Sequence, residues 1–232
     1  MTKTVPHVQT APWVAAVILA LLPVLFWLVF LYRRDRLKPE PLGTLLLAFG
    51  AGAASALVTL LSGLFRTYGQ FTSTVIFAPI VEETFKFLSV YLLVYRRKEF
   101  DEYVDGIVYA GTAALGFAGL ENVLYVLNAA QGGMWEFWST AGLRAILAVP
   151  GHFLFSSWWG YALGRARFAA TREEGMRFIR AGILRAIVSH AIYNFVVSYL
   201  FFGFAFFVIL VMTVLWRLFN ERLSALKKLD DA

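Results

Sequence analysis

The sequence of 232 residues contains no cysteine, few charged residues and three histidines. Without cysteine the chain cannot form disulfides, supply thiolate ligands to a metal or be palmitoylated, so the redox compartment stays undetermined. Charged residues make up 16% of the chain, against about 25% in soluble domains. Neither His-Glu-x-x-His nor Gly-x-Ser-x-Gly occurs, so the zincin and serine-hydrolase classes have no motif here.

Hydrophobic residues make up 59% of the chain, above the roughly 45–50% of soluble domains. They gather into runs long enough to cross a membrane, which takes about 20 mostly apolar residues. The sequence therefore predicts an all-α polytopic membrane protein with one membrane domain over residues 1–232 and a cytoplasmic tail over about 218–232. We expect about seven transmembrane helices, over residues 12–32, 42–64, 71–95, 104–129, 142–164, 181–200 and 202–217.

Lysine and arginine residues cluster in the connections after every second predicted span. Basic clusters follow the first, third, fifth and seventh spans, at residues 33–38, 96–98, 165–185 and 217–228. Because short cytoplasmic loops collect positive charge, the N-terminus is predicted outside and the C-terminus in the cytoplasm. The first span is longer than the apolar region of a signal peptide, so we expect an uncleaved anchor. The net charge of +6 then has a topological origin, and no other feature supports a nucleic-acid partner.

Ionisable residues interrupt four of the predicted spans. Such a side chain in hydrocarbon costs roughly 2.5–3.5 kcal/mol on insertion scales, so by default it marks a functional site. Structural roles compete with this interpretation: a buried ion pair, a carboxylate at the outer interface, or interhelical hydrogen bonds from histidine. Each ionisable residue has a polar companion nearby: Glu82 and Glu83 with Lys86, Glu121 with Asn122, His152 with Ser156, and His190 with Asn194.

Glu82 and Glu83 point about 100° apart on a helix, and Lys86 is within reach of either. We expect one glutamate to pair with Lys86, which leaves the other for chemistry. Carboxylates and histidines can together activate water, with one group as base and others stabilising an oxyanion. The same residue types bind Zn²⁺, which lowers the pKa of bound water. Both arrangements lead to hydrolysis.

Two prolines lie just before these polar residues, at Pro79 and Pro150. Proline has no backbone N–H and frees the carbonyl four residues earlier, at Val75 or Ile146. We therefore expect each helix to kink there, which can open room for water beside the polar side chains. Proline is also ordinary in transmembrane helices, so the functional interpretation competes with a neutral one.

Four short motifs in separate spans resemble those of the PrsW family of bacterial intramembrane proteases. They read EETFK at 82–86, FAGLE followed by asparagine at 117–122, GHFLFS at 151–156 and HAIYN at 190–194. The YRRDRLKPEP segment after the first span and the Asp-Gly pair at 105–106 are also similar. The resemblance covers roughly residues 30–197, in order. This family is a distant branch of the superfamily that contains CAAX prenyl proteases and Abi-type proteins.

The resemblance implies a helical fold in the bacterial cytoplasmic membrane and hydrolysis of a peptide bond in or near the bilayer. It implies a membrane-anchored substrate, such as an anti-sigma factor. The superfamily pattern points to Glu82 as the base and to His190 and Asn194 as the groups that stabilise the oxyanion. Glu121 stands where the CAAX branch has histidine, which follows the PrsW pattern and leaves the partner of Glu82 open.

Metal-dependent and metal-free descriptions have both been attached to this family. If Glu82 and Glu121 face one water, they either share a proton or are neutralised by a cation. We favour the metal-free mechanism, with no cofactor, because the charge of Lys86 opposes cation binding. In the alternative, a divalent metal such as Zn²⁺ binds at Glu82, Glu121, His152 and His190.

Two other classes of function compete with a protease. Glutamate and histidine inside a membrane also build proton relays, so a proton-coupled transporter is the main alternative. Against it, the chain shows no repeated halves with interrupted helices at corresponding positions. A membrane scaffold without catalysis is the second alternative, and the cost of several buried ionisable groups argues against it.

Overall fold

A computed structural model of the chain describes residues 10–34, 38–58, 67–200 and 204–231. These residues form helices and no strand. In chain order the helices are α1 (Thr10–Tyr32), α2 (Leu42–Ala56), η2 (Thr72–Phe77), α4 (Ala78–Leu93), α5 (Asp105–Ala129), α6 (Met134–Leu143), η3 (Arg144–Ala148), α7 (Val149–Arg167), α8 (Arg172–Tyr199) and α9 (Phe204–Asp230). The predicted all-α class is confirmed.

Three helices in the described part of the chain are long and apolar enough to cross a membrane: Trp13–Tyr32, Asp105–Ala129 and Arg172–Tyr199. α2 is apolar but shorter, and it ends at Ala56 where the sequence predicts a span to residue 64; residues 59–66 lie outside the described ranges. The fifth predicted span is part of a longer run, because α6, η3 and α7 follow one another without a break from Met134 to Arg167. The number of spans therefore remains a prediction.

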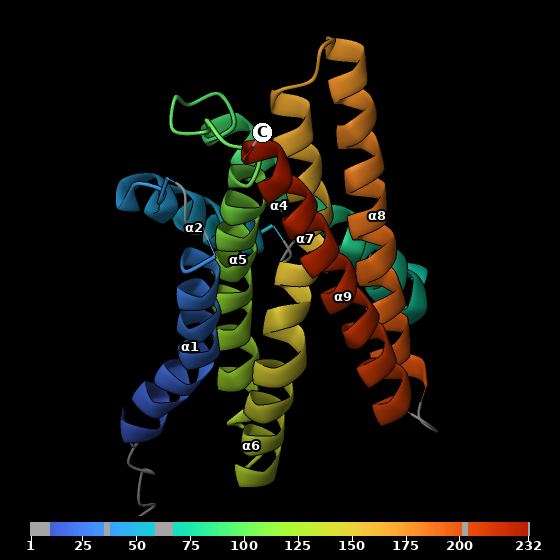
Figure 1. Cartoon of the computed structure of the whole chain (residues 1–232). Coiled ribbons are helices and arrows are strands. Elements are labelled where there is room, and N and C mark those ends of the chain that lie inside the picture. The colour runs from blue at the N-terminus through green and yellow to red at the C-terminus, as the bar shows by residue number, and fades with distance from the viewer. Residues whose placement is uncertain (1–9, 35–37, 59–66, 201–203, 232) are drawn as a thin grey trace, which may run out of the picture.

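α5 occupies the centre of the bundle (Figure 1). It packs against α1, α2 and α7, and α7 packs in turn against α8. Small residues allow the close approach: a Cβ built on Gly116 would lie 2.0 Å from the carbonyl oxygen of Phe49 in α2. Backbones that approach so closely are typical of helix contacts in membranes. The polar residues of α5 are thus held against three other helices.

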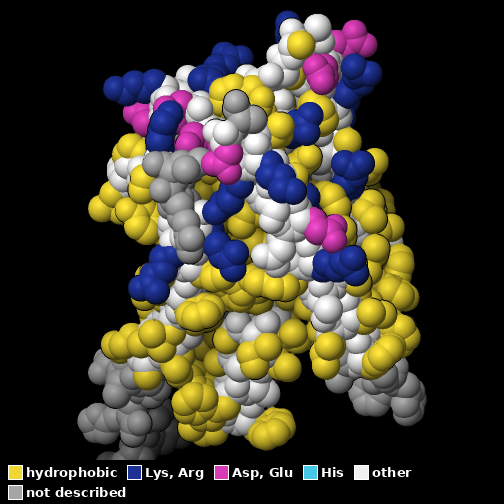
Figure 2. Space-filling model, in the orientation of Figure 1, with side chains coloured by type: hydrophobic (Ala, Val, Ile, Leu, Met, Phe, Trp, Pro, Cys, Tyr) yellow, Lys and Arg dark blue, Asp and Glu magenta, His cyan; other side chains and the backbone are white. Residues whose placement is uncertain are grey.

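Charged side chains gather at one end of the bundle. The α4–α5 connection, the α7–α8 turn and the C-terminal end of α9 lie at this end, whereas α1 begins and α8 ends toward the other (Figure 1). Figure 2 shows Lys, Arg, Asp and Glu among hydrophobic side chains over the upper and middle parts of the visible face, and hydrophobic side chains without charged ones over its lowest part. This distribution agrees with the predicted charge alternation, and the orientation in the membrane remains a prediction.

Both prolines singled out in the sequence follow a π-helical turn. η2 ends directly before α4, in which Pro79 is the second residue, and η3 stands in the same relation to α7 and Pro150. The structure has a π-helical turn at each position where the sequence predicts a kink, and the kink itself remains a prediction. Single π turns inside α-helices change which residues share a face, and they are frequent at functional sites.

The last turn of α9 contacts the ends of two other helices. Asp230 accepts hydrogen bonds from the backbone N–H groups of Tyr103, at 2.6 Å, and Val104, at 3.1 Å, just before α5 begins. Lys227 donates to the carbonyl of Arg34, just after α1 ends. These groups would otherwise be among the unpaired N–H and C=O groups at helix ends. The C-terminal helix therefore fixes α1 and α5 relative to each other.

Candidate active site

The ionisable side chains singled out in the sequence meet in one buried cluster. It draws residues from four helices: Glu82, Glu83 and Lys86 from α4, Glu121 from α5, His152 from α7 and His190 from α8. Lys86 and Glu83 are fully buried. Residues far apart in the sequence thus form a single polar network inside an apolar bundle.

Glu83 is saturated with hydrogen-bond donors. Lys86, one helical turn further along α4, pairs with Oε1 of Glu83, and His190 Nδ1 lies 3.1 Å from the same oxygen. The other carboxylate oxygen accepts from Ser156 at 2.9 Å and from the indole N–H of Trp159 at 3.1 Å. The expected pairing of one glutamate with Lys86 therefore falls on Glu83.

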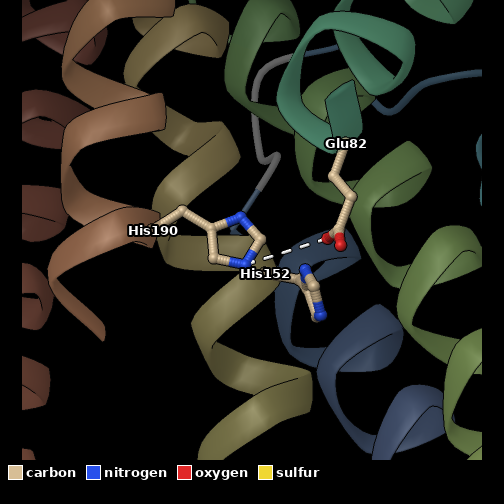
Figure 3. Close-up of side chains that lie close together, drawn as sticks. All are labelled: Glu82, His152 and His190. Carbon is tan, nitrogen blue, oxygen red and sulfur yellow. Dashed lines mark ion pairs between the residues drawn. The ribbon is translucent and has the colours of Figure 1, made fainter. Parts of the chain in front are cut away.

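Glu82 has the opposite environment. Its Oε2 atom is buried and has no hydrogen-bond partner in the part of the chain that the structure describes. Nε2 of His190 lies 3.8 Å from this oxygen. Glu82, His152 and His190 each offer one ligand atom, and these atoms lie within 4.8 Å of one another. Figure 3 shows the three side chains pointing toward one another from α4, α7 and α8.

His152 is held at both ring nitrogens. Its Nδ1 lies 3.2 Å from Nζ of Lys86, and its Nε2 lies 2.9 Å from Oε2 of Glu121. An ammonium group only donates hydrogen bonds, so Nδ1 accepts from Lys86 and Nε2 carries the hydrogen that Glu121 accepts. The ring of Phe117 packs beside both, 5.2 Å from the imidazole centre and 4.6 Å from the ammonium.

Glu121 and Asn122 contact a cation that the sequence motifs do not include. Arg144 donates to Oε2 of Glu121 at 2.7 Å and to Oδ1 of Asn122 at 2.8 Å. Asn122 also donates to the carbonyl of Ala20 in α1, at 2.7 Å. Arg144 stands apart from the basic clusters that set topology, and this isolation is the one signal in the sequence that points to it.

Asn194 bonds to the backbone of η2. Its side-chain amide donates to the carbonyl of Thr74 at 3.0 Å. In a π turn each N–H bonds the carbonyl five residues earlier, as Ala78 does with Ser73. Pro79 has no N–H for the next such bond, so Asn194 supplies the donor that Thr74 would lack. The amide has a second N–H, and the predicted role of Asn194 in stabilising an oxyanion remains a prediction.

The charges of the cluster do not cancel. Three carboxylates, Glu82, Glu83 and Glu121, face two cations, Lys86 and Arg144. With both histidines neutral, one negative charge remains, and it belongs to Glu82, because Glu83 and Glu121 have cationic partners. A buried carboxylate in this position either takes up a proton or binds a cation.

The donor set around Glu82 fits a divalent metal. One carboxylate and two imidazoles are the three protein ligands of a common type of catalytic zinc site. Glu82 has a free oxygen, and Glu83 orients His190 through Nδ1, as carboxylates do for metal-binding histidines. Ligation by His152 would replace its bond to Lys86 or to Glu121. Glu121 does not belong to this set of close ligand atoms among the described residues.

The relatives of this chain agree with its motifs. A family model described as "PrsW family intramembrane metalloprotease" matches residues 40–219. The chain belongs to the PrsW family. Membership makes it a peptidase and an integral membrane protein of bacterial type.

The curated relatives of this PrsW-family chain are similar over most of their length. "Protease PrsW" of Oceanobacillus iheyensis is 30% identical over 210 residues, 87% of this chain and 91% of the relative. "Protease PrsW" of Geobacillus kaustophilus is 34% identical over 173 residues, 72% of each chain. That of Clostridioides difficile is 26% identical and covers 89% of each. No solved structure matches significantly.

Proposed function

We propose that this PrsW-family chain hydrolyses a peptide bond in or near the membrane-spanning part of a membrane-anchored protein, with Glu82 as the base. The observation that carries the proposal is the contrast between adjacent carboxylates. Glu83 has four side-chain donors, whereas Oε2 of Glu82 has no hydrogen bond within the described chain and faces Nε2 of His190. A base needs a free lone pair within reach of water.

The surrounding residues prepare Glu82 for this role. Glu83 neutralises Lys86 and orients His190, so that the lone pair of Nε2 faces Glu82. Water placed between Glu82 and His190 would lose a proton to the carboxylate and attack the substrate carbonyl. The second N–H of Asn194 is the group we assign to the developing negative charge on the carbonyl oxygen, and His190 joins it only once Nε2 has taken up a proton.

We further propose that Glu82, His152 and His190 can hold a divalent cation such as Zn²⁺, in which case Glu82 would serve as a ligand instead of as the base. The preference for a metal-free site rested on Lys86, and pairing with Glu83 removes much of that objection. The remaining negative charge at Glu82 and the mutual distances of the three ligand atoms support the cation. When bound, such a cation supplies Lewis acidity to water and to the substrate carbonyl.

One observation favours the metal-free alternative. Both ring nitrogens of His152 already form hydrogen bonds, Nδ1 with Lys86 and Nε2 with Glu121. A site that keeps these bonds has two ligands, Glu82 and His190, too few for a three-ligand zinc site. Glu82 would then act on water alone, with His190 as its partner.

The substrate class follows from the resemblance and from the location of the site. The cluster is buried in an apolar bundle, so a substrate must present its peptide within the membrane or at its surface. We propose a single-span protein, such as an anti-sigma factor, as the substrate.

The test combines cleavage with metal analysis. Purified protein in liposomes is mixed with a single-span reporter, and Glu82→Gln is compared with Glu173→Gln, which alters an exposed glutamate at the start of α8. We expect no cleavage by Glu82→Gln and normal cleavage by the control. Cleavage by a folded Glu82→Gln protein contradicts the assignment. A stoichiometric metal that is lost in His190→Ala supports the metal site, and activity that survives exhaustive chelation supports the alternative.

A further inference from the structure

Arg144 is a partly buried cation beside the proposed site, outside every motif of the sequence. Its side chain is 15% exposed, and it belongs to η3, the π-helical segment before α7. The guanidinium bonds Glu121 and Asn122, which are neighbours on α5, and its carbon lies 4.0 Å from the ring centre of Tyr125. Two hydrogen bonds and a ring fix the plane of the group.

The π turn explains how Arg144 reaches the cluster. In a regular α-helix, residues 144 and 152 would point about 80° apart after eight residues. A π turn takes up one extra residue, so their relation becomes that of a seven-residue spacing, about 20° apart. Arg144 and His152 therefore share one face, about two turns apart, and both contact Oε2 of Glu121.

We infer that Arg144 is a positioning residue for the reaction: it holds Glu121 so that Glu121 fixes the ring of His152. The inference rests on the proposed function of the Glu82, His152 and His190 cluster. Oε2 of Glu121 lies 2.7 Å from Arg144 and 2.9 Å from His152, so one oxygen joins the two. Among the described residues Arg144 forms no hydrogen bond or ion pair with Glu82 or His190, although its charge also acts on Glu82 across the cluster. Its direct polar contacts are with Glu121 and Asn122, and only Glu121 leads on to His152.

The contacts of Glu121 show what removal of Arg144 would change. Glu121 would keep His152 as its partner but lose its charge partner and the second bond that holds its carboxylate. The carboxylate could then rotate, and Nε2 of His152 would lose its fixed acceptor. Asn122 stays bonded to Ala20 in α1, so the backbone of α5 keeps its place. The expected defect is a misaligned His152 in a folded protein.

A double-mutant cycle tests this chain of contacts. Arg144→Gln and Glu121→Gln are measured singly and together, with Arg165→Gln as control, because Arg165 is on the same continuous helix and contacts Tyr161 and Phe178 away from the site. We expect Arg144→Gln to lower kcat by about 10–100-fold with little change in KM, as for other residues that orient active-site histidines. Arg144→Lys should recover part of the loss, because it keeps the charge but not the two-pronged contact.

The decisive comparison is the effect of Arg144→Gln in the Glu121→Gln background. If Arg144 acts through Glu121, Arg144→Gln should lower kcat by less than about threefold in the Glu121→Gln background, because the effects of coupled residues are not additive. Full additivity overturns the inference, and a change confined to KM would make Arg144 a substrate-binding residue instead. The proposed function is tested separately: cleavage of the reporter by a folded Glu82→Gln protein would contradict it without bearing on the cycle of Arg144 and Glu121.

A second measurement does not need activity. The chain has three histidines, so ¹⁵N-histidine labelling with His152→Ala as reference identifies the ring signals of His152. The native protein should show hydrogen on Nε2, and Arg144→Gln and Glu121→Gln should both give the same mixture of tautomers. An unchanged His152 signal in a folded Arg144→Gln protein overturns the inference.

Discussion

His190 Nδ1 lies 3.1 Å from Oε1 of Glu83, and this contact decides which ring nitrogen faces Glu82. A carboxylate that also bonds Lys86, Ser156 and Trp159 is held in its acceptor form, so Nδ1 donates to it. The lone pair of Nε2 then points to Glu82, 3.8 Å away. The two adjacent glutamates of α4 therefore differ: Glu83 orients the ring of His190, and Glu82 keeps a free carboxylate oxygen.

Lys86→Met should reduce both the yield of folded protein and its activity. Lys86 is fully buried, and its removal leaves Glu83 without its cation, a loss of about 3–5 kcal/mol for a broken buried pair. Folded yield is measured by size-exclusion chromatography in detergent, and activity with the single-span reporter. Lys98→Met, at an exposed position, serves as the control. Normal yield and activity of Lys86→Met would show that the pair is dispensable.

Asn194→Ala should lower both stability and kcat. The substitution removes the donor to the partly buried carbonyl of Thr74, and an unpaired acceptor costs up to about 1–3 kcal/mol, less where water can reach it. Loss of a donor to the oxyanion would lower kcat by roughly 10²-fold or more with a smaller change in KM. Thermal unfolding and steady-state kinetics well below the midpoint separate the effects. A lower midpoint with unchanged kcat would limit Asn194 to bonding Thr74.

Reporter fusions should confirm the predicted orientation. Fusions after Arg97 and Arg172 should report a cytoplasmic location and a fusion near Gly133 an external one, because the first two lie in basic connections. In the structure the α4–α5 connection and the α7–α8 turn lie at the same end of the bundle (Figure 1). An external signal at either arginine would reverse or redraw the spans.

Asp230→Ala should destabilise the bundle, although Asp230 lies far from the site. It removes the acceptor for two backbone N–H groups at the start of α5, and loss of such a cap costs typically about 1 kcal/mol. In a chain of this size the unfolding midpoint should fall by roughly 2–4 °C. Asp231→Ala, one residue further on at an exposed position, is the matched control. Equal midpoints for the two variants would mean that Asp230 does not cap α5 in the protein.

Several features of the site could be predicted from short-range spacing alone. The distance of three residues from Glu83 to Lys86 and the prolines before Glu82 and His152 are visible along one helix. The structure agrees with these expectations, because they depend on the geometry of a single helix.

The contacts of Arg144 and Asn194 do not follow from short-range spacing. Arg144 reaches Glu121 because a π turn rotates it, and nothing in the local sequence fixes that turn beyond the proline that follows. Asn194 bonds to Thr74, which lies 120 residues earlier in the chain. Contacts of this range depend on the rotation and depth of two packed helices, which hydrophobic periodicity does not specify when a helix is apolar on nearly all sides.

The sequence by itself determined the all-α membrane class, the alternation of charge, and the four polar motifs that identify the family, because long apolar runs and buried ionisable residues are recognisable without a fold. Only the tertiary structure decided which glutamate pairs with Lys86 and which stays free, and which cation holds Glu121. Those choices depend on which donors other helices bring within about 3 Å, a distance set by packing between helices.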